Sequence, residues 1–101
     1  MKKYVYFIEA VGTNRVKIGF SSDPYLRLQQ IRTCSPFPVR LLAVIEGSVD
    51  LERAFHSQYD HKRIHGEWFI VGDDEIEEII KLNSDQENCI DYVFDALTSL
   101  N

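Results

Sequence analysis

The stretch that decides the fold is Tyr4–Ala10, which reads YVYFIEA, together with Val16–Ser21, which reads VKIGFS. Both segments alternate in polarity and are rich in β-branched and aromatic residues, which is typical of strands. Gly12-Thr13-Asn14 lies between them and is a turn signal. The sequence therefore predicts a β-hairpin at the start of the chain.

The two faces of this hairpin differ, because successive side chains of a strand point to opposite sides. The apolar face is predicted to join the core and carries Val5, Phe7, Val16, Ile18 and Phe20. The polar face carries Tyr4, Tyr6, Lys17, Gly19 and Ser21. Phenols, an ammonium and a glycine that admits a ligand suit a phosphate-handling surface. An ordinary half-exposed hairpin face has the same composition, so both interpretations stay open.

The rest of the chain is predicted to alternate helices and strands. Asp23-Pro24 is a helix start, and the helix should run to about Arg32 with Tyr25, Leu28 and Ile31 buried. Val39–Glu46 is apolar nearly throughout, which favours a central strand. Three later elements are predicted: a helix over about Val49–His61, a strand at Trp68–Val71 and a helix over Asp73–Leu82. A last helix is predicted to start at the capping box of Ser84–Glu87 and to carry apolar residues from Ile90 to Leu100.

This element order predicts the α+β class, with a small central mixed or antiparallel sheet of three to four strands flanked by helices. A chain of 101 residues forms one domain. We expect residues 1–72 to form the body of the fold. Residues 73–101 are expected to form an acidic C-terminal helical extension, packed on the same domain, that offers a homodimer or protein partner its apolar stripe.

Charge is distributed unevenly along the chain, whose net charge is −5. Residues 1–66 hold ten Lys/Arg against six Asp/Glu, and residues 67–101 hold one against ten. The balances of +4 and −9 permit a local anion-binding face on an acidic protein. No apolar run approaches the roughly 20 residues of a membrane span. Cys34 and Cys89 lie far apart and are interpreted as reduced thiols, so we expect a cytoplasmic protein without a membrane partner.

Candidate site residues also occur on the two predicted helices. Arg27 lies near a helix start, where the macrodipole disfavours a cation, so a nearby anion would explain it as well as plain solvation would. Glu52 and His56 are four residues apart and share a helix face, as an exposed pair or as a metal-binding carboxylate with a neighbour. Glu67 is either a second carboxylate on the metal side or a surface residue at a strand end.

These motifs, in this order, resemble the GIY-YIG nuclease superfamily, in particular its phage and prophage branch with a Lys-Ile-Gly second signature. The resemblance covers about residues 4–71. It is carried by Val5-Tyr6, Lys17-Ile18-Gly19, Arg27, Glu52 with His56, and Gly66-Glu67-Trp68-Phe69. Two departures are visible: the first signature has no glycine, and the family's late asparagine is absent, with Glu67 near its place.

The resemblance implies a role for each matched residue. Tyr6 would activate or orient the attacking water, and Lys17 would lower the pKa of Tyr6 or stabilise phosphate charge. Arg27 would clamp the scissile phosphate, and Glu52 would hold one Mg²⁺ or Mn²⁺ ion with His56 assisting. Tyr4, Gly19 and Arg32 are the further candidate contacts to substrate phosphate.

The expected function is metal-dependent endonuclease activity on DNA, by in-line water attack and with low intrinsic sequence specificity. Two alternatives remain. One is a catalytically weak or inactive nucleic-acid-binding protein that keeps the fold. The other is a phage accessory protein that acts through protein contacts of its acidic helices.

Overall fold

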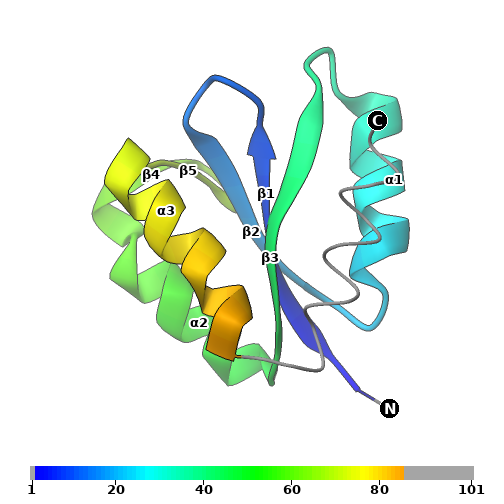
Figure 1. The fold of residues 1–101 in the computed structure, drawn as a ribbon, viewed down its shortest axis with the longest axis vertical. Coiled ribbons are helices and arrows are strands. Elements are labelled where there is room, and N and C mark those ends of the chain that lie inside the picture. Colours follow the sequence, from blue (N-terminus) through cyan, green and yellow to red (C-terminus); the bar gives the residue numbers. More distant parts are fainter. Residues whose placement is uncertain (1, 86–101) are drawn as a thin grey trace.

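The computed structural model describes residues 2–85 and shows an α+β fold in three layers (Figure 1). A five-stranded antiparallel sheet has the order β3-β1-β2-β5-β4. The strands are β1 (Tyr4–Ala10), β2 (Arg15–Ser21), β3 (Val39–Glu46), β4 (Arg63–His65) and β5 (Trp68–Ile70). Helix α1 (Pro24–Cys34) covers one face of the sheet, and α2 (Val49–Gln58) and α3 (Asp73–Lys81) cover the other. The predicted class is confirmed, with one strand more than predicted.

The additional strand is β4, which lies between the helix predicted to end near His61 and the strand predicted to begin at Trp68. A two-residue turn, Gly66-Glu67, joins β4 to β5, and Gly66 has φ +57, which a glycine adopts without strain. Arg63 holds the turn, because its guanidinium donates to the Gly66 carbonyl and lies 4.9 Å from the centroid of the Phe69 ring. The short strand therefore depends on turn chemistry and on one arginine rather than on an alternating pattern.

The β1–β2 hairpin has the predicted register. Tyr4 faces Ser21, Tyr6 faces Gly19, and Ile8 faces Lys17. Side chains on the predicted apolar face join a core cluster with Phe69 and residues of α3. The other face is not half exposed as its composition permits, because α1 packs on it and leaves Tyr6 only 2% exposed.

Strand β3 was predicted to be central, and this prediction is wrong: among the described residues it forms one edge of the sheet. Its apolar composition has another cause, since helices cover both of its faces and it contributes to both core clusters. The outer edge of β3 is covered in part by a side chain. Asn83 accepts a hydrogen bond from the Val44 N–H (3.2 Å) and donates to the Leu42 carbonyl (2.9 Å).

Helix α1 begins as predicted, because the Asp23 carboxylate accepts the Leu26 N–H at 3.0 Å and Pro24 follows the cap. Leu28 is buried, but Tyr25 is 36% exposed and not buried as predicted. The inward positions of α1 are Pro24 and Leu28, and Tyr25, one residue after Pro24, is turned about 100° away from them.

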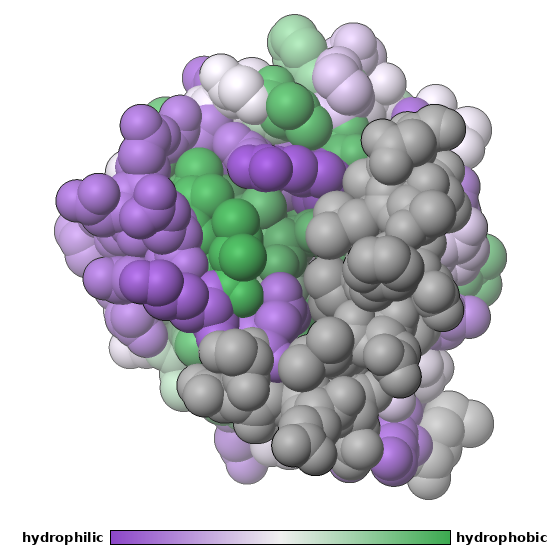
Figure 2. Space-filling model, viewed as in Figure 1, coloured by the Kyte–Doolittle hydropathy of each residue, from purple (hydrophilic) through white to green (hydrophobic). Residues whose placement is uncertain are grey.

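Ile76 and Ile79 of helix α3 pack in the core. Figure 2 shows apolar side chains between α3 and the sheet, bordered by hydrophilic ones. After α3 the chain forms a 3-10 turn at Leu82–Asp85. The predicted last helix, its apolar stripe over residues 90–100 and Cys89 lie outside the described residues. Within residues 2–85, no helix combines the length and the apolar character that crossing a membrane requires.

Candidate functional site

The candidate site lies where the sheet has an open edge, which is formed by residues 19–21 of β2. Strand β5 pairs with β2 only over Arg15–Lys17, and the Glu67 carbonyl accepts one further N–H, from Ile18, at 3.0 Å. Beyond this point, no other strand of the described residues pairs with this side of β2. Side chains from both faces of the sheet can therefore meet around the open edge.

Tyr6 reaches the open edge by crossing over Gly19. A Cβ atom on Gly19 would lie 2.2 Å from both Cζ and Oη of Tyr6. The ring thus occupies the space above the glycine, and this explains physically why the Lys-Ile-Gly motif ends in glycine. The phenol comes from the face of the sheet that α1 covers.

Glu52 and His56 approach from α2, on the opposite face. His56 Nε2 lies 2.8 Å from the Ile18 carbonyl oxygen, and because a carbonyl only accepts, Nε2 carries the proton. The Glu52 Oε2 atom lies 3.9 Å from the same nitrogen. The Glu52 and His56 side chains are 12% and 18% exposed. His56 therefore joins α2 to the edge of β2 and positions Glu52 beside it.

Glu67 completes the group from the tip of the β4–β5 turn. Its Oε1 lies 3.0 Å from Lys17 Nζ, so the ammonium of β2 holds the carboxylate in place. Within the described residues, Glu52, His56 and Glu67 form the only group of three or more potential metal ligands, with ligand atoms within 4.8 Å of one another.

The carboxylates fit a hard divalent cation. Burial and the nearby negative charge of Glu67 raise the pKa of Glu52, and His56 partly opposes this rise. Two carboxylates that disfavour each other's charge are stabilised by a cation between them. Mg²⁺ is commonly held by one or two carboxylates and several waters, and Mn²⁺ accepts the same oxygen ligands. His56 is not available through Nε2, so Glu52 and Glu67 are the better-placed ligands.

Burial raises the pKa of Tyr6 to about 12, with a further contribution from the charge of Glu67. The cation that opposes this rise is Arg27 of α1. Lys17 was expected to lower the pKa of Tyr6 or to stabilise phosphate charge. The first role does not hold, because burial dominates the pKa of Tyr6 and the ammonium is paired with Glu67. At neutral pH the Tyr6 hydroxyl keeps its proton and serves as a hydrogen-bond donor.

The family model of the T5orf172 domain matches residues 3–84. This chain belongs to the T5orf172 domain family. The T5orf172 domain is found in phage and in some nuclease-like proteins. No match was found among the curated proteins or among the solved structures. The matched range includes every residue of the candidate site.

Not every predicted site residue of this T5orf172 domain joins the cluster. Tyr6, Lys17, Glu52 and His56 surround the open edge, and Arg27 acts on Tyr6 through its charge. Other predicted contacts lie elsewhere or serve another purpose. Tyr4 packs against the core cluster under α1, Gly19 admits the Tyr6 ring, and Arg32 lies at the other end of α1 near Phe37 and Val39.

Glu67 is the site residue that sequence reasoning left open. Its place in the chain, directly after Gly66 and before Trp68-Phe69, is the only sequence signal for it. In the structure, two contacts hold the Gly66-Glu67 turn against β2. The Glu67 carbonyl accepts the Ile18 N–H, and the Glu67 carboxylate pairs with Lys17.

Proposed function

We propose that this T5orf172 domain is a metal-dependent nuclease of the GIY-YIG type that hydrolyses DNA phosphodiester bonds. The observation that carries the proposal is the meeting of two carboxylates from separate elements, Glu52 and Glu67, beside the open edge that Tyr6 reaches. Phosphodiester hydrolysis needs a cation to offset phosphate charge and groups that orient water, and this site offers residues for both.

Glu52 and Glu67 would hold the metal, Mg²⁺ or Mn²⁺, which when bound polarises the phosphate and stabilises the departing oxygen. Lys17 keeps the Glu67 carboxylate at the open edge through their 3.0 Å ion pair. His56 keeps α2 against the edge of β2 through the Ile18 carbonyl. Both are positioning residues in this proposal.

Tyr6 and Arg27 would act on the substrate itself. The neutral phenol of Tyr6 holds its proton on Oη and orients the attacking water or donates to a phosphate oxygen. Arg27 is exposed and its positive charge acts on Tyr6, so its guanidinium is placed to take a phosphate beside the phenol. The proposed reaction is in-line hydrolysis by water without a covalent enzyme intermediate.

The first experiment compares nicking of supercoiled plasmid by the wild type, Glu52→Gln and Glu67→Gln, with Mg²⁺ or Mn²⁺ and with EDTA. Each substitution is expected to lower the nicking rate at least about 100-fold, as the loss of one charge-stabilising group does in other enzymes. EDTA should abolish nicking by the wild type. Glu77→Gln, which removes an exposed carboxylate of α3, is the matched control and should nick normally.

Metal binding is measured separately by calorimetric titration with Mn²⁺. Glu52→Gln and Glu67→Gln should each weaken Mn²⁺ binding while circular dichroism stays unchanged. Normal nicking by Glu52→Gln would refute the proposal. DNA binding by the wild type without any cleavage would instead support the alternative, a DNA-binding protein that keeps the fold and lacks the chemistry.

A further inference from the structure

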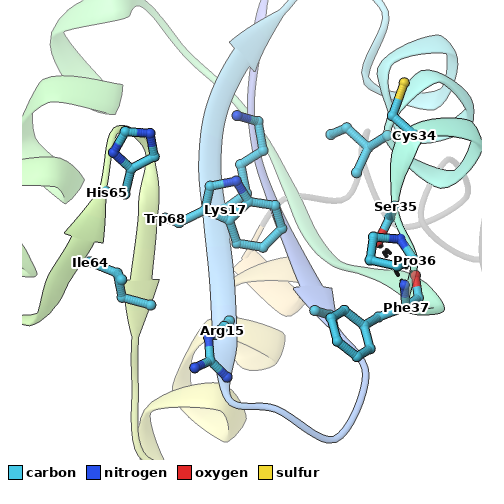
Figure 3. Close-up of a pocket in the computed structure, with 11 residues that line it drawn as sticks. Arg15, Lys17, Cys34, Ser35, Pro36, Phe37, Ile64, His65 and Trp68 are labelled. Atoms are coloured by element: carbon cyan, nitrogen blue, oxygen red, sulfur yellow. Dashed lines mark hydrogen bonds between the residues drawn. The ribbon is translucent and has the colours of Figure 1, made fainter.

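A hollow lies beside the candidate site, on the face of the sheet that α1 covers. It has a volume of about 460 Å³ and lies between β2, the β4–β5 hairpin and the loop after α1. Figure 3 shows Lys17 and Trp68 side by side on neighbouring strands, with Phe37 on the other wall. The lining residues are Ala10, Arg15, Lys17, Ile31, Cys34, Ser35, Pro36, Phe37, Ile64, His65 and Trp68.

The walls of the hollow combine aromatic surface with positive charge. Trp68 and Phe37 supply the rings, while Arg15 and Lys17 supply the cations, and none of the lining residues is acidic. Phe37 is 56% exposed and Ile64 is 46% exposed, although large apolar side chains gain by being covered. In a protein of net charge −5, this local combination indicates an anionic ligand with an apolar, flat part.

Lys17 connects the hollow to the candidate site. Its ammonium lies 3.0 Å from Glu67 on the site side and 5.8 Å from the centroid of the Trp68 ring. A ligand in the hollow is thus within one side chain of the place proposed for the scissile phosphate. Aromatic rings beside cations that follow a backbone are the arrangement by which proteins hold single strands.

We infer that this hollow takes one unstacked nucleobase of the strand to be cleaved, so that the preferred substrate is single-stranded or locally unpaired DNA. The inference rests on the proposed function for the position of the phosphate. A base inside a duplex is stacked on both sides and paired, so it cannot enter without being extruded. A base that is already unpaired enters without that cost and stacks on Trp68 and Phe37.

The chain provides its own reporter, because Trp68 is the only tryptophan in the sequence. The experiment measures its fluorescence in a Glu52→Gln background, which blocks cleavage, during titration with an oligothymidylate of about 12 nucleotides. A blunt duplex of the same length is the comparison ligand. The single strand is expected to quench the fluorescence at concentrations at least about tenfold lower than the duplex does.

Phe37→Ala tests the wall of the hollow without touching the proposed catalytic residues. Because Phe37 is exposed, its removal should leave the fold intact, and it is expected to weaken single-strand binding about 5- to 100-fold. Phe37→Leu, which keeps bulk but loses the aromatic face, should lose a large part of this affinity too. The matched control is Ile80→Ala, which removes another exposed apolar side chain, from α3, and should bind as the parent does.

An abasic residue placed in turn at each position of the oligonucleotide locates the base. Loss of the base at one position should lower the affinity of the parent protein for the oligonucleotide. The same abasic oligonucleotide should lower the affinity of Phe37→Ala little further. Equal quenching by single strand and duplex, or unchanged affinity of Phe37→Ala, would overturn the inference. Failure of the proposed function looks different: Glu52→Gln would nick plasmid normally while the Phe37 dependence of quenching persisted.

Discussion

Gly19 shows how much the candidate site depends on one missing side chain. The Tyr6 ring fills the space of its Cβ, so any larger residue must push the phenol away from the open edge. The hydrogen-bond donor that we propose for the attacking water would move by an ångström or more. Such displacements have large effects on catalysis even where the fold survives.

Gly19→Ala is therefore expected to lower the nicking rate about 100-fold. It should also reduce stability by about 1–3 kcal/mol through overpacking. Gly72→Ala is the matched control, because the nearest atom to its added Cβ is 3.5 Å away and its φ of −76 suits any residue. Thermal unfolding and plasmid nicking measure the two effects. A folded Gly19→Ala protein that nicks at the wild-type rate would remove Tyr6 from the mechanism.

The roles of several single residues could be predicted from the sequence, and others could not. Alternation along β1 and β2 was sufficient to place Tyr6, Lys17 and Gly19 on one face. The ion pair that engages Lys17 with Glu67 was not predictable, because it depends on where a later turn docks. Arg27 and Arg32 are five residues apart, about 140° around a helix, so only one of them could face the site.

At the scale of elements, α3 shows how a helix start is fixed by a carboxylate. Glu75 Oε1 accepts the Gly72 N–H at 2.8 Å and pairs with Lys62. The backbone hydrogen bond from Gly72, and then the contact with Lys62, lower the pKa of Glu75. The charged form is thus favoured in the folded state. Its stabilising contribution is present in full above the unfolded pKa, near 4.5, and is lost as the pH falls through the lower folded pKa.

Glu75→Gln is expected to lower the free energy of unfolding by about 1 kcal/mol at pH 7. The difference from the wild type should shrink as the pH falls below about 4.5, because the wild-type carboxylate then becomes neutral as well. Urea unfolding at several pH values measures this. Glu77→Gln on the same helix should show little difference at any pH. If the free energy of unfolding of Glu75→Gln stayed below that of the wild type by the same amount at acidic pH, the charge of Glu75 would not be the cause of the difference.

The elements also show why the site could not be assembled from sequence patterns alone. Helix and strand types follow from periodicity, and most were predicted within a few residues. The open edge exists because β5 is three residues long while β2 has seven, and no periodic pattern sets that difference. Without it, the sheet would separate Glu52 on one face from Tyr6 on the other.

For the whole molecule, the sheet separates charge. The acidic α3 lies on one face of the sheet, and α1, which carries Arg27, covers the other (Figure 1). Arg15 and Lys17 line the hollow beside the loop after α1. The molecule extends 30 × 30 × 23 Å, which exceeds the roughly 10 Å over which charges act at 0.1 M salt. A negative net charge is therefore compatible with a surface that attracts a nucleic-acid strand.

This arrangement predicts strong salt dependence. Lys17 is already paired with Glu67, so Arg15 and Arg27 contribute. Two cations at a single strand give a slope of about −1.4 in log affinity against log salt, so a rise from about 50 to about 200 mM weakens binding about 7-fold. Arg15→Gln should lower the magnitude of the slope by about 0.7. Lys2→Gln, a cation paired with Glu46, should leave the slope unchanged. Fluorescence anisotropy measures the affinity for the single strand at several salt concentrations. An unchanged slope for Arg15→Gln would exclude Arg15 from the contact surface.

The covered margin of β3 has a consequence for how copies of this protein can assemble. The Asn83 amide already occupies hydrogen-bonding groups of Leu42 and Val44, and at the far margin β4 is short and carries Arg63. Short, charged or covered margins resist the backbone-to-backbone growth that begins fibrils. Two copies that associate through these elements would thus meet by side-chain contact, without merging their sheets into one.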